Sequence, residues 1–146
     1  MNRRGVHLAL AALVLHLVLV QPNHPAAMNW DALLLFPLEL PVLLLGLVAV
    51  QPGRMEKTIR TVIVAALLLI VVLKTADFAM FTALARGFNP VADLPLIEAG
   101  LRLATGAVGP LLTIAGVIAA VTALVCVGRA LWWATGVWAQ VTVTVI

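Results

Sequence analysis

The stretch that decides the fold is residues 62–73, which read VIVAALLLIVVL and contain no polar side chain. This stretch is the centre of a longer apolar segment, and a helix of about 20 largely apolar residues is long enough to cross a bilayer. Of the 146 residues in the chain, 64% are hydrophobic and only 10% are charged. A soluble domain carries about 25% charged residues, and a water-soluble fold of this size could not bury so much apolar surface. The sequence therefore predicts an all-α integral membrane protein with one domain over residues 1–146.

Four segments are predicted to span the membrane, with approximate bounds at residues 4–20, 31–50, 58–85 and 107–127. The first could instead be a signal peptide, but residues 21–27 offer no good small-x-small cleavage site, which favours an uncleaved anchor helix. In the second span, Pro37 and Pro41 each remove a helix hydrogen bond, so this span is expected to kink or to start late. The predicted architecture is a bundle of four transmembrane helices.

A last apolar segment, residues 130–146, contains Trp132, Trp133 and Trp138. Tryptophan collects at the bilayer interface, so this segment is predicted to be either an interfacial stretch or the beginning of a fifth span. The abrupt apolar end also leads us to expect that the natural chain continues past Ile146. A fifth span would then deliver the chain to the outer side.

The segment between the third and fourth spans, residues 86–106, is predicted to carry an amphipathic helix on the outer membrane surface. Apolar residues recur there at helical spacing, at Leu94, Ile97, Leu101 and Ala104. Glu98 and Arg102 add an i,i+4 ion pair in the favourable order. The alternative is an ordinary structured loop.

The distribution of basic residues between the loops predicts the orientation. Basic residues precede the first span and surround the second loop, whereas residues 21–30 contain no Lys or Arg. The basic residues in question are Arg3, Arg4, Arg54, Lys57 and Arg60. The N-terminus and the second loop are therefore predicted to be cytoplasmic. Arg86 and Arg102 lie on the predicted outer side and weaken this asymmetry.

Three ionisable residues at membrane depth, Glu39, Lys74 and Asp77, form the candidate functional cluster. Placing one charge at the centre of a membrane helix costs about 2.5–3.5 kcal/mol or more, so such residues are functional candidates. With a rise of about 1.5 Å per residue, Glu39 and Asp77 are expected about 12 Å, and Lys74 about 16 Å, below the outer edge. The cluster could fix helix register, or Lys74 could extend to the interface. The alternative is a proton or ion path.

Small residues in the fourth span predict close helix packing. Gly109, Gly116 and Ala120 lie along this span, and residues 116–120 form a small-xxx-small pattern. The partner helix belongs either to this chain or to another one. Cys126, the single cysteine, is predicted to be a buried and inert thiol.

No catalytic motif is evident in the 146 residues. The sequence has no phosphate-binding glycine loop, nucleophile elbow, cysteine pair or HExxH motif, so no catalytic, cofactor or metal site is predicted. No basic stripe with interleaved aromatic residues is present, which argues against nucleic-acid binding. The predicted partners are the lipid bilayer and either other membrane subunits or an external domain beyond residue 146.

One part of the sequence resembles a known family. Residues 73–78 read LKTADF, Phe81 follows, and residues 86–90 read RGFNP, with Asp93 three residues later. This pattern resembles the N-terminal membrane domain of bacterial sulfatase-like proteins of the alkaline phosphatase superfamily, which include lipoteichoic acid synthases and phosphoglycerol or phosphoethanolamine transferases. The resemblance covers most of the chain, and its specific part is residues 74–93.

The resemblance implies about five helices ahead of an external catalytic domain, in a multi-pass protein of the bacterial inner membrane. That family's Thr or Ser nucleophile and its metal-binding Asp, His and Glu residues match no position of this chain, so any enzymatic activity would depend on a domain outside it. The first expected function is therefore that of a membrane anchor domain. The alternatives are an accessory subunit of a larger respiratory or photosynthetic complex and a small transporter component.

Overall fold

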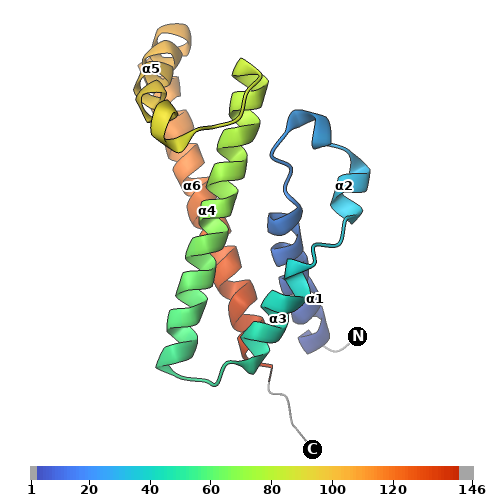
Figure 1. Cartoon of the computed structure of the whole chain (residues 1–146). Helices are drawn as coiled ribbons and strands as arrows, with labels where there is room; N and C mark the ends of the chain where they lie inside the picture. Colours follow the sequence, from blue (N-terminus) through green and yellow to red (C-terminus); the bar gives the residue numbers. More distant parts are fainter. Residues whose placement is uncertain (1–2, 142–146) are drawn as a thin grey trace, which may run out of the picture.

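The computed structural model describes residues 3–141, and every regular element in this range is a helix (Figure 1). In chain order these are α1 (Arg3–Val20), the short 3-10 helix η1 (Pro25–Ala27), α2 (Trp30–Leu34), α3 (Glu39–Ala49), α4 (Arg54–Leu84), α5 (Pro90–Val108) and α6 (Pro110–Ala139). Among the described residues, α1, α4 and α6 are the helices that are long and apolar enough to cross a membrane. The predicted fold class, an all-α membrane helix bundle, is confirmed.

The two ends of the bundle differ in charge. One end, called here the basic end, is where α1 and α4 begin and α6 finishes (Figure 1). Its basic side chains are Arg3, Arg4, Arg54, Lys57 and Arg60. The opposite end, called here the corner end, is where α4 turns into α5. The loop-charge pattern of the sequence thus corresponds to one physical end of the molecule.

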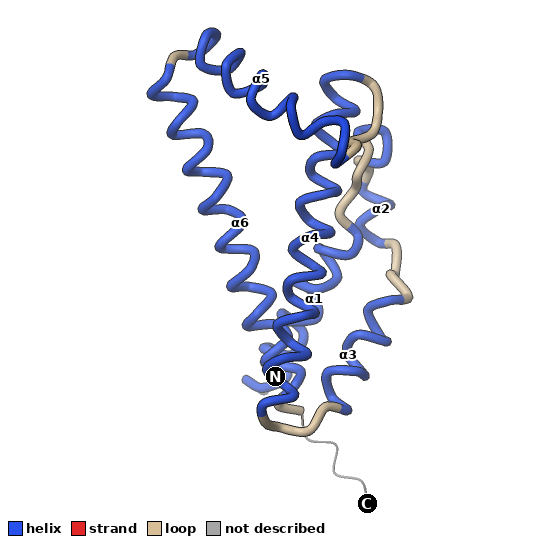
Figure 2. The backbone as a smooth tube through the Cα atoms, turned by 60° about the vertical axis from the view of Figure 1, so that its left-hand side comes forward, coloured by secondary structure: helices blue, strands red, loops and turns tan. Residues whose placement is uncertain are grey.

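The buried core lies in the half of the bundle nearer the basic end. Its members come from α1, α3, α4 and α6, and they are Ala11, Leu15, Leu40, Val64, Leu67, Leu131 and Ala134. Figure 2 shows α4 and α6 close together near the basic end and diverging toward the corner end, where α5 bridges them. Because the helices diverge, none of residues 111–126 of α6 is buried within the chain.

The predicted second span, residues 31–50, is not one helix. It is divided into α2 and α3, and residues 35–38 between them lie outside either helix. Pro37 explains the interruption, because proline has no N–H to donate and disfavours the helical conformation at the preceding Phe36. Pro41 is the third residue of α3, where backbone N–H groups have no partner within the helix, so it costs α3 no hydrogen bond.

The predicted fourth span and the C-terminal segment form a single helix. α6 has 30 residues and so a length of about 45 Å. No proline interrupts it after its first residue, so nothing in the sequence stops the helix at residue 127. Trp132, Trp133 and Trp138 therefore belong to the last three turns of α6 and not to a separate interfacial stretch or fifth span. Residues 142–146 of the predicted segment lie outside the described part of the chain.

The predicted outer helix is α5, which crosses the corner end and meets α6 at Gly109. Gly109 has a φ of 86°, a conformation that favours glycine because a Cβ atom would be strained there. Its N–H donates to the carbonyl of Thr105 at the end of α5, and Pro110 then begins α6. Gly109 therefore serves the turn between two helices, where the sequence suggested helix packing.

Candidate functional site

The corner between α4 and α5, residues 85–93, is fixed by a buried ion pair. The carboxylate of Asp93, which is only 2% exposed, accepts hydrogen bonds from Arg86 Nη2 at 2.6 Å and from Arg86 Nη1 at 3.0 Å. It also accepts one from the backbone N–H of Asn89 at 2.7 Å. The hydrogen bonds from Arg86 and then from Asn89 lower the pKa of Asp93, and the same pair raises the pKa of Arg86. Asp93 is therefore held as a carboxylate.

Asn89 and Pro90 determine where α5 begins. The side chain of Asn89 accepts hydrogen bonds from the backbone N–H groups of Val91 and Ala92, at 3.0 and 3.2 Å. Pro90 occupies the first helical position, where its missing N–H costs nothing. Since Asp93 bonds back to the N–H of Asn89, the cap is reciprocal, in the manner of a capping box.

The corner is also tied back to α4. Asp77 Oδ1 accepts a hydrogen bond from the backbone N–H of Phe88 at 2.8 Å. Ala85 ends α4 in the left-handed conformation, with a φ of 52°, and its N–H donates to the carbonyl of Phe81. A Cβ atom on Gly87 would lie 3.6 Å from Asp77 Oδ1, so the loop runs close over α4.

The end of α1 attaches to α4 just below this corner. Lys74 Nζ donates to the carbonyl of Leu19 at 2.7 Å, and Gln21 Nε2 donates to Thr75 Oγ1 at 3.0 Å. One step further, the ring of His24 packs against the ring of Phe81, with centroids 4.3 Å apart. Lys74 therefore satisfies a carbonyl group that the end of α1 leaves free.

The predicted cluster of Glu39, Lys74 and Asp77 is only partly brought together. Glu39 is the exposed first residue of α3 and attracts Lys74 electrostatically, but no ion pair joins the three side chains among residues 3–141. Lys74 and Asp77 instead bond to the backbone of Leu19 and Phe88. These two contacts attach the end of α1 and the corner to α4.

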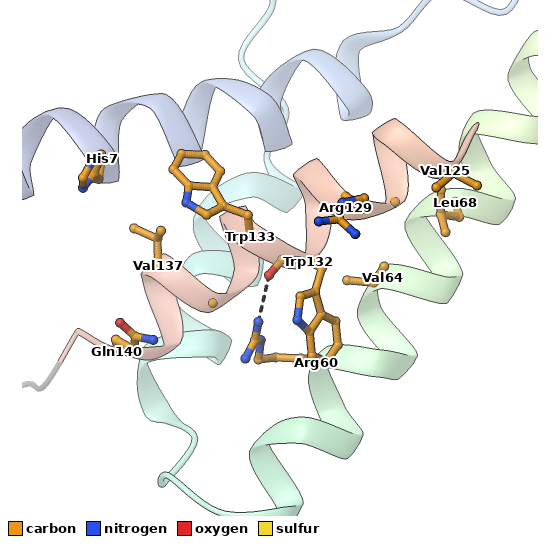
Figure 3. A pocket seen from close by; sticks show the side chains of 12 residues that line it. His7, Arg60, Val64, Leu68, Val125, Arg129, Trp132, Trp133, Val137 and Gln140 are labelled. Atoms are coloured by element: carbon orange, nitrogen blue, oxygen red, sulfur yellow. Dashed lines mark hydrogen bonds between the residues drawn. The ribbon is translucent and has the colours of Figure 1, made fainter. Parts of the chain in front are cut away.

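A cavity of about 830 Å³ lies at the basic end, between α1, α4 and α6 (Figure 3). Arg60 lies against it and is held in three ways: Nη1 pairs with Glu56 at 3.1 Å, Nη2 donates to the carbonyl of Trp132 at 2.8 Å, and the guanidinium stacks 4.2 Å from the Trp132 ring centre. His7 meets the ring of Trp133 edge-on, with centroids 6.4 Å apart. The sequence does not predict this cavity, because Arg60 and Trp132, which meet beside it, lie 72 residues apart.

Two of the three tryptophans predicted at the interface line this cavity, and the third packs elsewhere. Trp132 and Trp133 line the cavity and are 41% and 42% exposed. Trp138 packs against the core instead, and its Nε1 is buried without a hydrogen-bond partner among the described residues. Trp132 and Trp133 therefore each present part of an indole ring to the cavity at the basic end.

Close approach between helices of this chain occurs at two glycines outside the predicted set, and a partner helix from another chain at the predicted positions stays a prediction. A Cβ on Gly128 would lie 3.4 Å from Leu68 Cδ1, and one on Gly136 would lie 2.6 Å from Arg60 Nη2. A Cβ on Gly116 would meet nothing within 4 Å, and Ala120 is exposed. Cys126, predicted to be buried, is exposed on the surface of the described chain.

The side chains of residues 3–141 form no group of three His, Cys, Asp or Glu that could hold a metal ion. The features with defined geometry are thus the corner at one end of the bundle and the cavity at the other. No family model, curated protein or solved structure matches this chain.

Proposed function

We propose that this chain is a membrane domain that anchors an external domain of the sulfatase-like or phosphoglycerol-transferase-like class and supplies no catalytic residue itself. The observation that carries the proposal is the α4–α5 corner. Lys74, Asp77, Arg86, Asn89 and Asp93 belong to the sequence pattern that resembles that family, and each of them makes a hydrogen bond that holds this corner or the adjoining end of α1. These hydrogen bonds account for the pattern, so it requires no catalytic role for the five residues.

The corner gives α5 a fixed place across one end of the bundle. Glu98 and Arg102 on α5 pair with each other and remain 73% and 79% exposed in their side chains. A helix held in this way offers a domain outside the membrane an exposed surface, on which this ion pair stands among apolar side chains such as Ile97 and Leu103. The basic end then faces the cytoplasm of a bacterial cell, in keeping with the preference of basic loops for that side. Because α6 also finishes at this end, a further span after residue 146 would carry the chain across to the external domain.

A protease-protection experiment on the source cells tests this function. An antibody against residues 51–60, at the basic end, should detect a polypeptide much larger than 15.4 kDa, the mass of these 146 residues. Protease added to intact cells should remove the external domain and leave a shorter membrane fragment that retains the epitope. A native band at about the mass of this chain would overturn the anchor proposal. Loss of the epitope in intact cells would overturn the orientation.

A second function, that of an accessory subunit, is favoured by the interruption between α2 and α3. The 11 residues of α3 rise about 16 Å, so residues 35–38 lie near the middle of a hydrocarbon core of about 30 Å. Non-helical backbone at this depth is tolerated where protein or water covers it, because lipid cannot satisfy its polar groups. Phe36 and Leu38 are nevertheless 64% and 80% exposed. A neighbouring membrane protein would cover this interruption.

Site-specific photo-crosslinking separates the two functions. A photoreactive residue at Phe36 should crosslink to a second polypeptide if the chain is an accessory subunit. Leu112 on α6 is the matched control, because it is equally exposed, at 63%, but lies in an uninterrupted helix. A protein crosslink that is specific to Phe36 supports the accessory subunit. Crosslinks to lipid alone at both positions would count against it.

A further inference from the structure

The cavity at the basic end is lined by cationic and polar side chains near the membrane boundary. Arg60, Arg129, His7 and Gln140 contribute to its wall, from α4, α6 and α1 (Figure 3). No Asp or Glu is among the lining residues. Arg60 already pairs with Glu56, whereas Arg129 makes no hydrogen bond or ion pair within the described chain. One positive charge is therefore left without a counterion beside this cavity, which favours an anion as its occupant.

The remaining wall is apolar and leads toward the bilayer interior. Leu68 lies eight residues beyond Arg60 along α4, which is about 12 Å further from the basic end. Val125 lies four residues before Arg129 on α6, about 6 Å further in the same direction. Val64 belongs to the same part of the wall, whereas Val137 adds an apolar side chain on the side of Arg129 nearer the basic end. A ligand that fills the cavity must therefore be charged at one end and apolar along the rest of its length.

The level of the cavity relative to the membrane follows from Arg60. Arg60 directly precedes the uncharged stretch 61–73 of α4, and its guanidinium contacts Trp132 of α6. Arg129 lies three residues before Trp132 on α6, and a side chain of its length can extend toward the same level. Arginine at the end of a span and tryptophan beyond it are characteristic of the headgroup level.

The geometry points to a binding site for one anionic phospholipid, with its phosphate near Arg129 and Arg60 and its acyl chains along Leu68 and Val125. Arginine suits phosphate because its planar fork can donate two hydrogen bonds to two oxygens. Glu56, the carbonyl of Trp132 and the Trp132 ring hold Arg60 in one orientation before a ligand arrives, which reduces the entropy lost on binding. Basic pockets between membrane helices at the headgroup level are a recognised means of lipid selection. This site is independent of the anchor function, because it lies at the opposite end of the bundle from the corner.

Tryptophan quenching by brominated lipids tests the site in the intact chain. A Trp30→Phe background removes the indole that lies outside this region, and the remaining indoles are Trp132, Trp133 and Trp138. The protein is placed in phosphatidylcholine vesicles that contain a minor fraction of phosphatidylglycerol with brominated chains. A parallel sample contains the same fraction of brominated phosphatidylcholine. Quenching should correspond to about fivefold local enrichment of phosphatidylglycerol, the size expected for one basic residue acting on an anionic lipid.

Arg129→Gln should reduce this enrichment to the level of the phosphatidylcholine sample, whereas Arg129→Lys should retain most of it. Arg102→Gln is the matched control, because it removes an exposed arginine from the corner end and should change nothing. Equal quenching by the two brominated lipids, or unchanged enrichment in Arg129→Gln, would overturn the site. Complete displacement by added inorganic phosphate would show that a soluble anion is the ligand and would overturn the assignment to lipid.

Discussion

Replacing Asp93 by asparagine is expected to release α5 from the end of α4. Asparagine keeps the shape of the side chain, but its amide nitrogen would face the N–H donors of Arg86 or Asn89, and the charge that holds Arg86 would be gone. Removing the partner of a buried charged group costs far more free energy of folding than removing the partner of an exposed one. In hydrogen–deuterium exchange of the protein in nanodiscs, residues 86–96 should exchange on the order of tenfold faster, because the opening free energy of this segment falls.

Glu98→Gln is the control for this prediction. It breaks an Arg–carboxylate pair on the same helix, but both side chains there are exposed, and exposed pairs contribute little to stability. Exchange of residues 86–96 should therefore remain as in the parent protein. Equal protection in Asp93→Asn and Glu98→Gln would show that the buried pair does not hold the corner.

The pKa of Asp93 sets the pH range in which the corner is stable. Because this pKa is lower in the folded protein, the ion pair contributes fully at neutral pH and is lost only as the pH falls through the lowered value. The corner should thus remain closed throughout the range in which a free aspartate is ionised. A domain that rests on α5 would therefore not be released by mild acidification.

The second large effect is expected for Leu131→Ala in the core. Leu131 is fully buried on α6, and the change leaves a cavity between helices from the three long spans. The expected loss is about 2 kcal/mol, at the lower end of the range for buried leucines, because lipid is as apolar as the core and only the packing is lost. Reversible unfolding in mixed detergent micelles should measure this loss as an earlier transition.

Leu111→Ala provides the comparison for the core variant. Leu111 lies on the same helix but is 79% exposed, so its truncation should change the free energy of unfolding by less than about 0.5 kcal/mol. Similar transitions in the two variants would mean that the buried cluster does not stabilise the bundle. A shift in Leu131→Ala alone would locate the stabilising contacts in the half nearer the basic end.

The helices themselves follow closely from the sequence where one physical signal dominates. α1 and α4 correspond to apolar runs that end at proline or glycine, and the apolar period near Leu94 corresponds to α5. α6 runs 12 residues beyond the predicted end of the fourth span at residue 127. Arg129 does not end it, because a helix can continue past a charged residue whose side chain extends toward the headgroups.

Side-chain partners were much harder to predict than helices. The depths of Glu39, Lys74 and Asp77 predict one cluster, yet Lys74 and Asp77 each bond to the backbone of another segment. Which partner is nearer depends on where α1 and the corner lie, and local spacing contains no information about that. Gly116 illustrates the same limit, because a small-residue pattern shows that helices can approach closely but not where they do.

The divergence of α4 and α6 gives α5 a mechanical role. α5 is one helix of 19 residues, about 28 Å long, and it separates the ends of α4 and α6 at the corner end. The buried core holds the same two helices together nearer the basic end. None of residues 111–126 of α6 is buried within the chain, so what packs against this half of the helix in a membrane is lipid or another protein.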